Sequence, residues 1–93
     1  MGFDKDSATA AAKRDLAQRL KLDEADISVS SVTGKDFPDM SLGLTESGEM
    51  AAQMISTGWE ILLSAAGRPY EYRADKYQLR LKDFEGRNHV VKG

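Results

Sequence analysis

The sequence WEILLSAAGRPYEYRADKYQLRLK, residues 59–82, carries the most regular pattern in the chain. Apolar and polar residues alternate along it, and the alternation is interrupted at residues 67–69 and again at residues 75–76. A period of two places alternate side chains on one face of a half-buried strand. The segment therefore predicts three antiparallel strands joined as a meander.

An amphipathic helix is predicted ahead of the meander, over residues 8–21. The segment is rich in alanine and other strong helix formers. Asp6 or Ser7 can cap its first turn. The helix should bury one stripe, which consists of Ala8, Ala12, Leu16 and Leu20. Its small alanines allow it to approach a sheet closely.

A first strand is predicted at residues 27–33, followed by a long loop. The alternation slips between Val29 and Val32, which indicates a bulge or a shorter strand. Residues 34–58 are then interrupted by Pro38, Gly43, Gly48 and Gly58. Within this loop the run from Met50 to Ile55 fits either a helix or a strand. We expect an extended segment that pairs with the strand at Trp59.

Together these elements predict an α+β fold in one domain of 93 residues. One N-terminal helix should pack on a four-stranded, mostly antiparallel sheet, in the order α-β-loop-β-β-β. Residues 7–82 form the expected ordered core. We expect residues 1–6 and 84–93 to be mobile, although Val90 and Val91 could add an edge strand.

Composition limits the possible environments and chemistry. The chain has no cysteine, which excludes disulfides and thiolate metal sites. No apolar run is long enough to span a membrane, and we expect no signal peptide within these residues. The compartment is left open by these features. A monomer is expected.

Charge is distributed unevenly along the sequence. Residues 1–67 contain six Lys/Arg and eleven Asp/Glu, a net charge of −5. Residues 68–93 contain seven Lys/Arg and four Asp/Glu, a net charge of +3. The basic part could meet an acidic partner, or the two regions could simply pair or remain solvated.

No constellation of residues indicates catalysis, a cofactor or a metal. His89, the single histidine, has no neighbouring metal ligand and is expected to be a solvated residue near the C-terminus. The glycines do not form a phosphate-binding loop. Asp36 and Asp39 are expected to cap turns rather than to bind calcium. We therefore expect a non-enzymatic protein.

Tyrosines and arginines on the predicted strands raise the alternative of nucleic-acid binding. Tyr70, Tyr72 and Tyr77 resemble a stacking platform beside Arg73 and Arg80. However, the tyrosines share the phase of the apolar residues, so they are expected to lie under the helix. The arginines should point to the opposite face.

The loop after the first strand is the predicted site of partner binding. Its candidate residues are Phe37, Asp39, Met40, Ser41, Leu42 and Leu44. If its apolar side chains are exposed, they form the kind of patch that marks an interface. If the loop folds back over the sheet, they belong to the core. Both arrangements stay open, and burial is the preferred one.

The same loop resembles a small domain of bacterial secreted proteins and lipoproteins. Members of that group read Trp-Pro-Asp-x-Ser-Leu-Gly-Cys-Pro where this chain reads FPDMSLGLT at residues 37–45. Later features also match, namely Ala52-Gln53, Gly58-Trp59 and Tyr70-Glu71-Tyr72. Phe37, Leu44 and Thr45 depart from the pattern, so any cysteine-dependent property of that group is absent. The order of helix and meander is more loosely similar to PepSY-type domains.

The resemblance implies a module of the bacterial cell envelope. We therefore predict a non-catalytic domain that binds or regulates a protein or peptide through residues 35–48. The alternative is a small nucleic-acid-binding domain that uses the basic C-terminal third.

Overall fold

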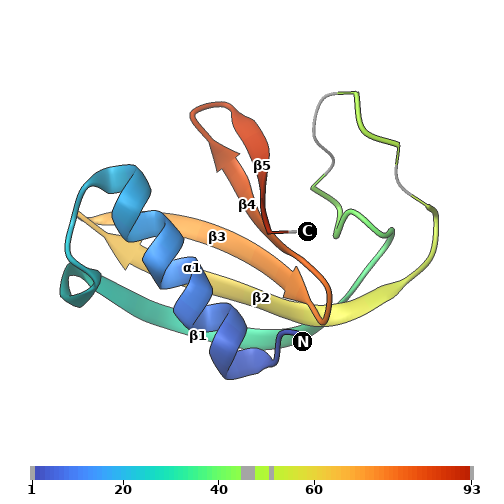
Figure 1. Ribbon diagram of the computed structural model, residues 1–93, viewed down its shortest axis with the longest axis horizontal. Coiled ribbons are helices and arrows are strands. Elements are labelled where there is room, and N and C mark those ends of the chain that lie inside the picture. Colours follow the sequence, from blue (N-terminus) through green and yellow to red (C-terminus); the bar gives the residue numbers. More distant parts are fainter. Residues whose placement is uncertain (1, 45–47, 51, 93) are drawn as a thin grey trace.

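The computed structural model describes residues 2–44, 48–50 and 52–92. Its elements are α1 (Lys5–Leu20), a 3-10 turn η1 (Glu24–Asp26), β1 (Ile27–Phe37), β2 (Ser56–Ala65), β3 (Arg68–Asp75), β4 (Leu79–Phe84) and β5 (Arg87–Lys92). The five strands form one sheet in the order β1-β2-β3-β4-β5, and all neighbours are antiparallel. Figure 1 shows α1 lying across the first three strands. The predicted α+β class is confirmed, but the sheet has five strands rather than four.

Helix α1 begins three residues before its predicted start. Asp4 is the N-cap, and its side chain accepts a hydrogen bond from the backbone N–H of Ser7 (2.7 Å). Ser7 reciprocates by accepting the N–H of Asp4 (2.9 Å). The cap was therefore predicted at the wrong residue. Lys21, in the left-handed conformation, ends the helix.

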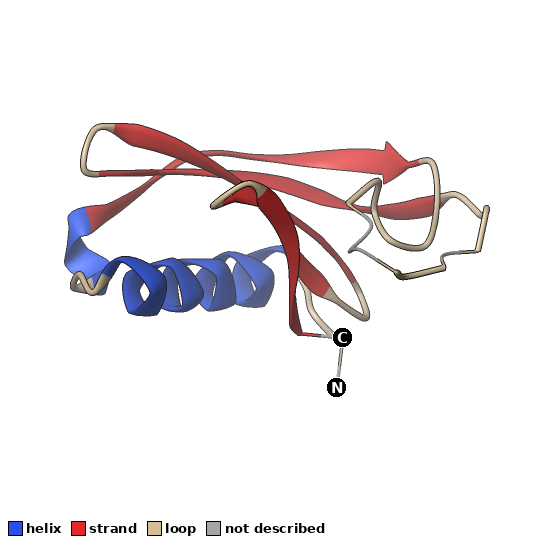
Figure 2. Cartoon of the chain, turned by 90° about the horizontal axis from the view of Figure 1, so that it is seen from above, coloured by secondary structure: helices blue, strands red, loops and turns tan. Residues whose placement is uncertain are grey.

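The core lies between α1 and one face of the sheet, as seen edge-on in Figure 2. Ala8, Ala12 and Leu16 from the predicted stripe are fully buried. From the sheet, this core receives Ile61, Leu63, Ala65, Tyr72, Ala74, Leu79 and Leu81. The alternation of the meander therefore predicted most of the inward-facing side chains correctly.

Tyr77 is an exception to the predicted phase. It lies in the turn between β3 and β4 and is 71% exposed. Strand β4 begins only at Leu79, so Tyr77 precedes the region where alternation determines burial. Tyr72 is fully buried as predicted, and Tyr70 is half-buried.

Strand β1 extends four residues beyond the predicted segment, to Phe37. Its pairing with β2 shifts register between Val29 and Ser31. The predicted bulge is thus confirmed at the place where the alternation slips.

Strand β5 contradicts the prediction of a mobile C-terminal segment. It pairs with β4 through a two-residue turn in which Glu85 (φ 54°) and Gly86 (φ 81°) both have positive φ. That is the conformation of a type I′ hairpin turn. His89 is half-buried rather than solvated, and its Nε2 lies 3.0 Å from the carbonyl oxygen of Phe84. The sequence of this strand has little apolar alternation. It is ordered instead by its pairing with β4 and by bonds from the Asn88 and His89 side chains to the backbone of β4.

The described residues between Gly48 and Ile55 form neither helix nor strand. The prediction that this run pairs with the strand at Trp59 is therefore wrong, since β2 itself begins at Ser56. Ala51, which belongs to the predicted run, lies outside the described residues. Among those that are described, no helix has the length and apolar character needed to cross a membrane.

Candidate binding surface

The second face of the sheet, opposite α1, carries a row of charged residues. Glu60 on β2 is the register partner of Arg73 on β3, which is the partner of Arg80 on β4. Register partners project to the same face of a sheet. The arginines therefore point away from the core, as predicted. In Figure 1 the β4–β5 hairpin stands between α1 on one side and the loop after β1 on the other.

Both arginines hold the loop against this face. The Nη1 atom of Arg73 donates to the carbonyl oxygen of Leu42 (2.9 Å), and that of Arg80 donates to the carbonyl oxygen of Leu44 (3.1 Å). Arg80 also forms a two-pronged ion pair with Glu49. The guanidinium carbon of Arg73 lies 5.5 Å from the ring centroid of Phe37, within the range of a cation–π contact.

Asp39 organises the turn that the arginines hold. Its Oδ1 accepts hydrogen bonds from the backbone N–H groups of Ser41 (2.9 Å) and Gly43 (3.1 Å) and from the Ser41 hydroxyl. These bonds, led by the one from the hydroxyl, lower the pKa of Asp39 below its usual value. The predicted role of Asp39 as a turn cap is confirmed.

Gln78 joins the turn to the sheet. Its amide nitrogen donates to the carbonyl oxygen of Met40, and its amide oxygen accepts from Nε of Arg80 (2.7 Å). We call residues 37–44 the cover segment. Its backbone carbonyls accept hydrogen bonds from side chains of β3, β4 and the turn between them.

The cover segment buries the apolar residues that were predicted to contact a partner. Phe37, Leu42 and Leu44 are at most 2% exposed, and Ser41 is fully buried. Of the six candidates, only Asp39 and Met40 are half-buried. The structure therefore places this segment in the core arrangement. Partner binding through it stays a prediction, but exposed apolar side chains cannot be its basis.

A different set of apolar side chains is exposed beside the cover segment. Met54, Ile55 and Tyr77 are 63%, 74% and 71% exposed. Together with Met40 they line a shallow pocket of about 260 Å³. We call these four residues the apolar patch. It combines the segment that precedes β2 with the β3–β4 turn.

Hydrogen bonds hold the backbone beneath the apolar patch. The N–H groups of Met40 and Met54 both donate to the carbonyl oxygen of Ala52 (2.9 Å each). On the opposite side of the pocket, the N–H of Tyr77 donates to Asp75 Oδ1 (2.7 Å). The backbone of the patch is therefore held by hydrogen bonds, while the side chains of Met54, Ile55 and Tyr77 face solvent.

A family model described as a domain of unknown function, DUF8738, matches residues 9–81. The chain belongs to this family. No curated protein and no solved structure matches it. The DUF8738 span contains β1, β2, β3, the cover segment and the apolar patch, and it ends inside β4. The family description does not bear on the resemblance to secreted-protein or PepSY-type domains, which stays a prediction.

Sequence reasoning missed most of the apolar patch. It treated residues 50–55 only as a question of helix or strand, and it assigned Tyr77 to the core. The available signal was an apolar run between Gly48 and Gly58 with no polar alternation to bury it. Such a run, when it is not part of a regular element, is a candidate for exposure.

The arginines that support the nucleic-acid alternative are already engaged. Arg73 also bonds Glu71 (2.6 Å), and Arg80 is only 5% exposed. Phosphate binding would have to compete with these contacts. Within the described ranges, no group of three or more potential metal-ligating His, Cys, Asp or Glu residues is present.

Proposed function

We propose that this domain is a non-catalytic module that binds a protein or peptide partner, and that the apolar patch makes the contact. The observation that carries the proposal is the clustering of Met54, Ile55 and Tyr77 around one pocket with most of each side chain in solvent. Exposed apolar clusters of this kind mark interaction sites, and tyrosine and methionine are enriched in interfaces.

The composition of the patch suits an apolar partner surface. Methionine side chains are flexible and polarisable, so Met40 and Met54 can adapt to a partner. Tyr77 adds a large ring whose loss of conformational freedom on binding is small. Lys76 lines the same pocket and makes no side-chain hydrogen bond or ion pair with another described residue. It can therefore pair with an acidic group at the rim of the partner.

The cover segment contributes by pre-organising the patch. Met40 belongs to both, and its backbone is bonded to Gln78 on one side and to Ala52 on the other. A surface that is already ordered loses less entropy when it binds. Placement in the bacterial cell envelope, and a regulatory role there, are supported by the resemblance of residues 37–44.

The proposal can be tested with the ¹⁵N-labelled domain and bacterial envelope extract. We expect chemical-shift changes or line broadening at residues 40, 54–57 and 75–77. Changes spread evenly over the sheet, or no changes at all, would contradict the proposal.

Matched variants separate the patch from general stickiness. Ile55→Asp and Tyr77→Asp should abolish the response, because each places a charge in the proposed interface. Val29→Asp is the control, since Val29 is 43% exposed and lies on β1, outside the patch. It should respond like the wild type. A response that survives both patch substitutions would remove the patch from the interface.

A further inference from the structure

A gap opens in the sheet between β3 and β4. Their pairing covers only Tyr72–Ala74 with Leu79–Leu81. Strand β3 begins four residues earlier, at Arg68, and β4 continues to Phe84. Figure 1 shows the β4–β5 hairpin turning away from β3 beyond their short pairing. Residues 68–71 are therefore paired with β2 on one side and with no strand over most of their other edge.

Local bonds explain why β4 leaves β3. Asp83 has a left-handed conformation (φ 48°), which interrupts the extended strand. Its N–H donates to Oδ1 of Asn88 (2.9 Å), and the carbonyl of Phe84 lies 3.0 Å from Nε2 of His89. Side chains of β5 thus satisfy backbone groups at the end of β4. The edge of β3 at residues 68–71 has no such covering.

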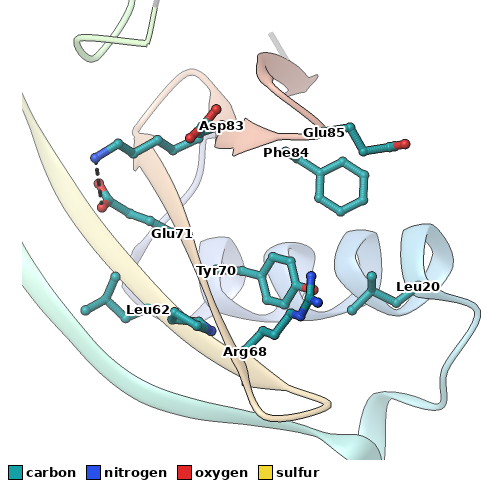
Figure 3. A pocket seen from close by; sticks show the side chains of 10 residues that line it. Leu20, Leu62, Arg68, Tyr70, Glu71, Asp83, Phe84 and Glu85 are labelled. Carbon is teal, nitrogen blue, oxygen red and sulfur yellow. Dashed lines mark ion pairs between the residues drawn. The ribbon is translucent and has the colours of Figure 1, made fainter.

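This gap forms a pocket of about 680 Å³, which we call the β3–β4 slot. Figure 3 shows Tyr70, Leu20 and Phe84 near one another at the slot, with the Lys82–Glu71 ion pair at one end. The rings of Tyr70 and Phe84 are tilted by 45°, with centroids 6.2 Å apart. Pro69 on this edge lacks an N–H group, so a strand that pairs here can bond only to its carbonyl oxygen. The slot thus has an apolar wall beside an open strand edge.

The charges of the slot favour a basic ligand group. Glu71 is already paired with Nε of Arg73 (2.6 Å) and with Nζ of Lys82 (3.6 Å). Asp83 and Glu85 are exposed, and their carboxylates make no hydrogen bond or ion pair with another described residue. Arg68, at the start of β3, is a cation whose side chain likewise makes no hydrogen bond or ion pair with another described residue. Two carboxylates without a partner among the described residues therefore lie at the end of β4 and in the turn that follows it.

We propose that the β3–β4 slot binds an extended peptide segment by strand addition. The peptide backbone pairs with β3 along residues 68–71, as in other strand-addition complexes. One apolar side chain of the peptide packs on Tyr70 and Phe84. A neighbouring lysine or arginine pairs with Asp83 and Glu85. The slot lies at the beginning of β3 and the apolar patch lies at its end, so the two sites are independent.

The test uses two capped pentapeptides, acetyl-Thr-Lys-Leu-Val-Thr-amide and its counterpart with glutamate in place of lysine. Each is titrated into the ¹⁵N-labelled full chain at millimolar concentrations. We expect saturable shifts at residues 68–71 and 82–85 with the lysine peptide. The glutamate peptide should bind about threefold more weakly or worse, as expected for an exposed ion pair.

A double variant, Asp83→Asn with Glu85→Gln, checks the charge assignment. Asparagine tolerates the left-handed conformation of residue 83, so the fold should be retained. The variant should bind both peptides equally. The absence of saturable shifts at the slot, shifts confined to Met54 and Tyr77, or equal affinity of the wild type for both peptides would overturn the proposal. None of these results depends on whether envelope extract contacts the apolar patch.

Discussion

Arg80 and Glu49 form an ion pair in which both Nη atoms of the arginine lie 2.6 Å from the two carboxylate oxygens of the glutamate. The arginine belongs to β4, and the glutamate follows the cover segment by five residues. Only 6% of the Arg80 side chain is exposed, whereas 28% of the Glu49 side chain is. The pair therefore joins the loop to the sheet at the edge of a buried region.

Substitution of Arg80 should destabilise the domain more than substitution of Glu49. Arg80→Met deprives Glu49, the Leu44 carbonyl and the Gln78 amide of one shared donor, and we expect a loss of about 2–4 kcal/mol in the free energy of unfolding. Glu49→Gln leaves Arg80 its neutral acceptors. Because Glu49 is partly exposed, we expect this substitution to lower the free energy of unfolding by only about 1 kcal/mol. Urea denaturation measures both.

The pair between Lys35 and Glu60 provides the matched control. Its Nζ–Oε2 distance is 2.9 Å, but 47% of the Lys35 side chain is exposed. Lys35→Met should therefore change the free energy of unfolding by about 0.5 kcal/mol or less. Equal losses for Lys35→Met and Arg80→Met would contradict the assignment of Arg80 as the anchor of the loop.

The turn centred on Asp39 should make stability depend on acidic pH. Hydrogen bonds lower the pKa of Asp39 in the folded protein below its ordinary value of 3.8. A group whose pKa is lowered by folding stabilises the folded protein at pH values above its pKa in the unfolded chain. This stabilisation is lost as the pH falls through its pKa in the folded protein. Asp39→Asn should cost about 1 kcal/mol at neutral pH, and the difference from wild type should shrink below pH 3.8.

Urea denaturation at neutral and acidic pH checks the prediction for Asp39. Asp36→Asn is the control, because Asp36 is exposed and its side chain accepts a hydrogen bond from the Thr57 hydroxyl (2.8 Å). We expect it to cost under about 0.5 kcal/mol. A pH-independent difference between Asp39→Asn and wild type would show that the charge of Asp39 has no role in the turn.

The bond from Tyr72 to Asp15 should make stability depend on alkaline pH. The Tyr72 hydroxyl donates to Oδ2 of Asp15 (2.7 Å), which also pairs with Nε of Arg19 (2.7 Å). Burial, and then this bond, raise the pKa of Tyr72 well above its ordinary value of 10. A group whose pKa is raised by folding stabilises the folded protein at pH values below its pKa in the unfolded chain. This stabilisation is lost as the pH rises above that pKa.

Tyr72→Phe isolates this contribution. It should cost about 1–2 kcal/mol at neutral pH, because one buried hydrogen bond is removed. Above pH 10 the advantage of the wild type should decline by about 1.4 kcal/mol per pH unit, since only its unfolded chain releases the Tyr72 proton there. Guanidinium denaturation between neutral pH and pH 11 would show this, and a constant difference would refute it.

Much of the fold could be predicted because local pattern and tertiary burial agree. The stripe from Ala8 to Leu16 has helical spacing, and Ile61 with Leu63 has strand spacing; both faces turn toward one core. The slip between Val29 and Val32 also located the β1 bulge. In each case the physical cause is a single periodicity acting on one buried face.

Strand β5 could not be predicted in this way, because its order depends on partners that lie elsewhere in the chain. Asn88 and His89 are polar, and they become ordered by bonding backbone groups of Asp83 and Phe84. The Glu85-Gly86 turn adopts the same positive φ values as the Asn-Gly turns that normally signal a hairpin. Glutamate is a much weaker signal for that turn.

Partner binding stays a proposal, and most residues of the apolar patch were not indicated by the sequence. The sequence left open whether the loop after β1 is exposed or buried and favoured burial, and the side chains of Phe37, Leu42 and Leu44 are buried. Their burial depends on Arg73 and Arg80, which are more than 25 residues away along the chain. No local pattern specifies those two contacts.

Gly58 of β2 should be less replaceable than Gly34 of β1. It is the register partner of Asp75 on β3 and of Lys35 on β1. A Cβ added at this position would lie 2.0 Å from the carbonyl oxygen of Ala74 and 2.9 Å from two further backbone atoms of β3. Backbone atoms in the middle of a sheet cannot move aside as a flexible side chain can.

We therefore expect Gly58→Ala to reduce the free energy of unfolding by about 3 kcal/mol or more, as a severe case of overpacking. Gly34→Ala is the matched control, because a Cβ there meets nothing within 4 Å and neither glycine has a positive φ. It should be neutral or stabilise the domain by about 0.5 kcal/mol, since alanine restricts the unfolded chain. Urea denaturation decides the matter. Equal stability of the two variants would contradict this prediction, because it would mean that β2 and β3 can move apart at residue 58 without loss of stability.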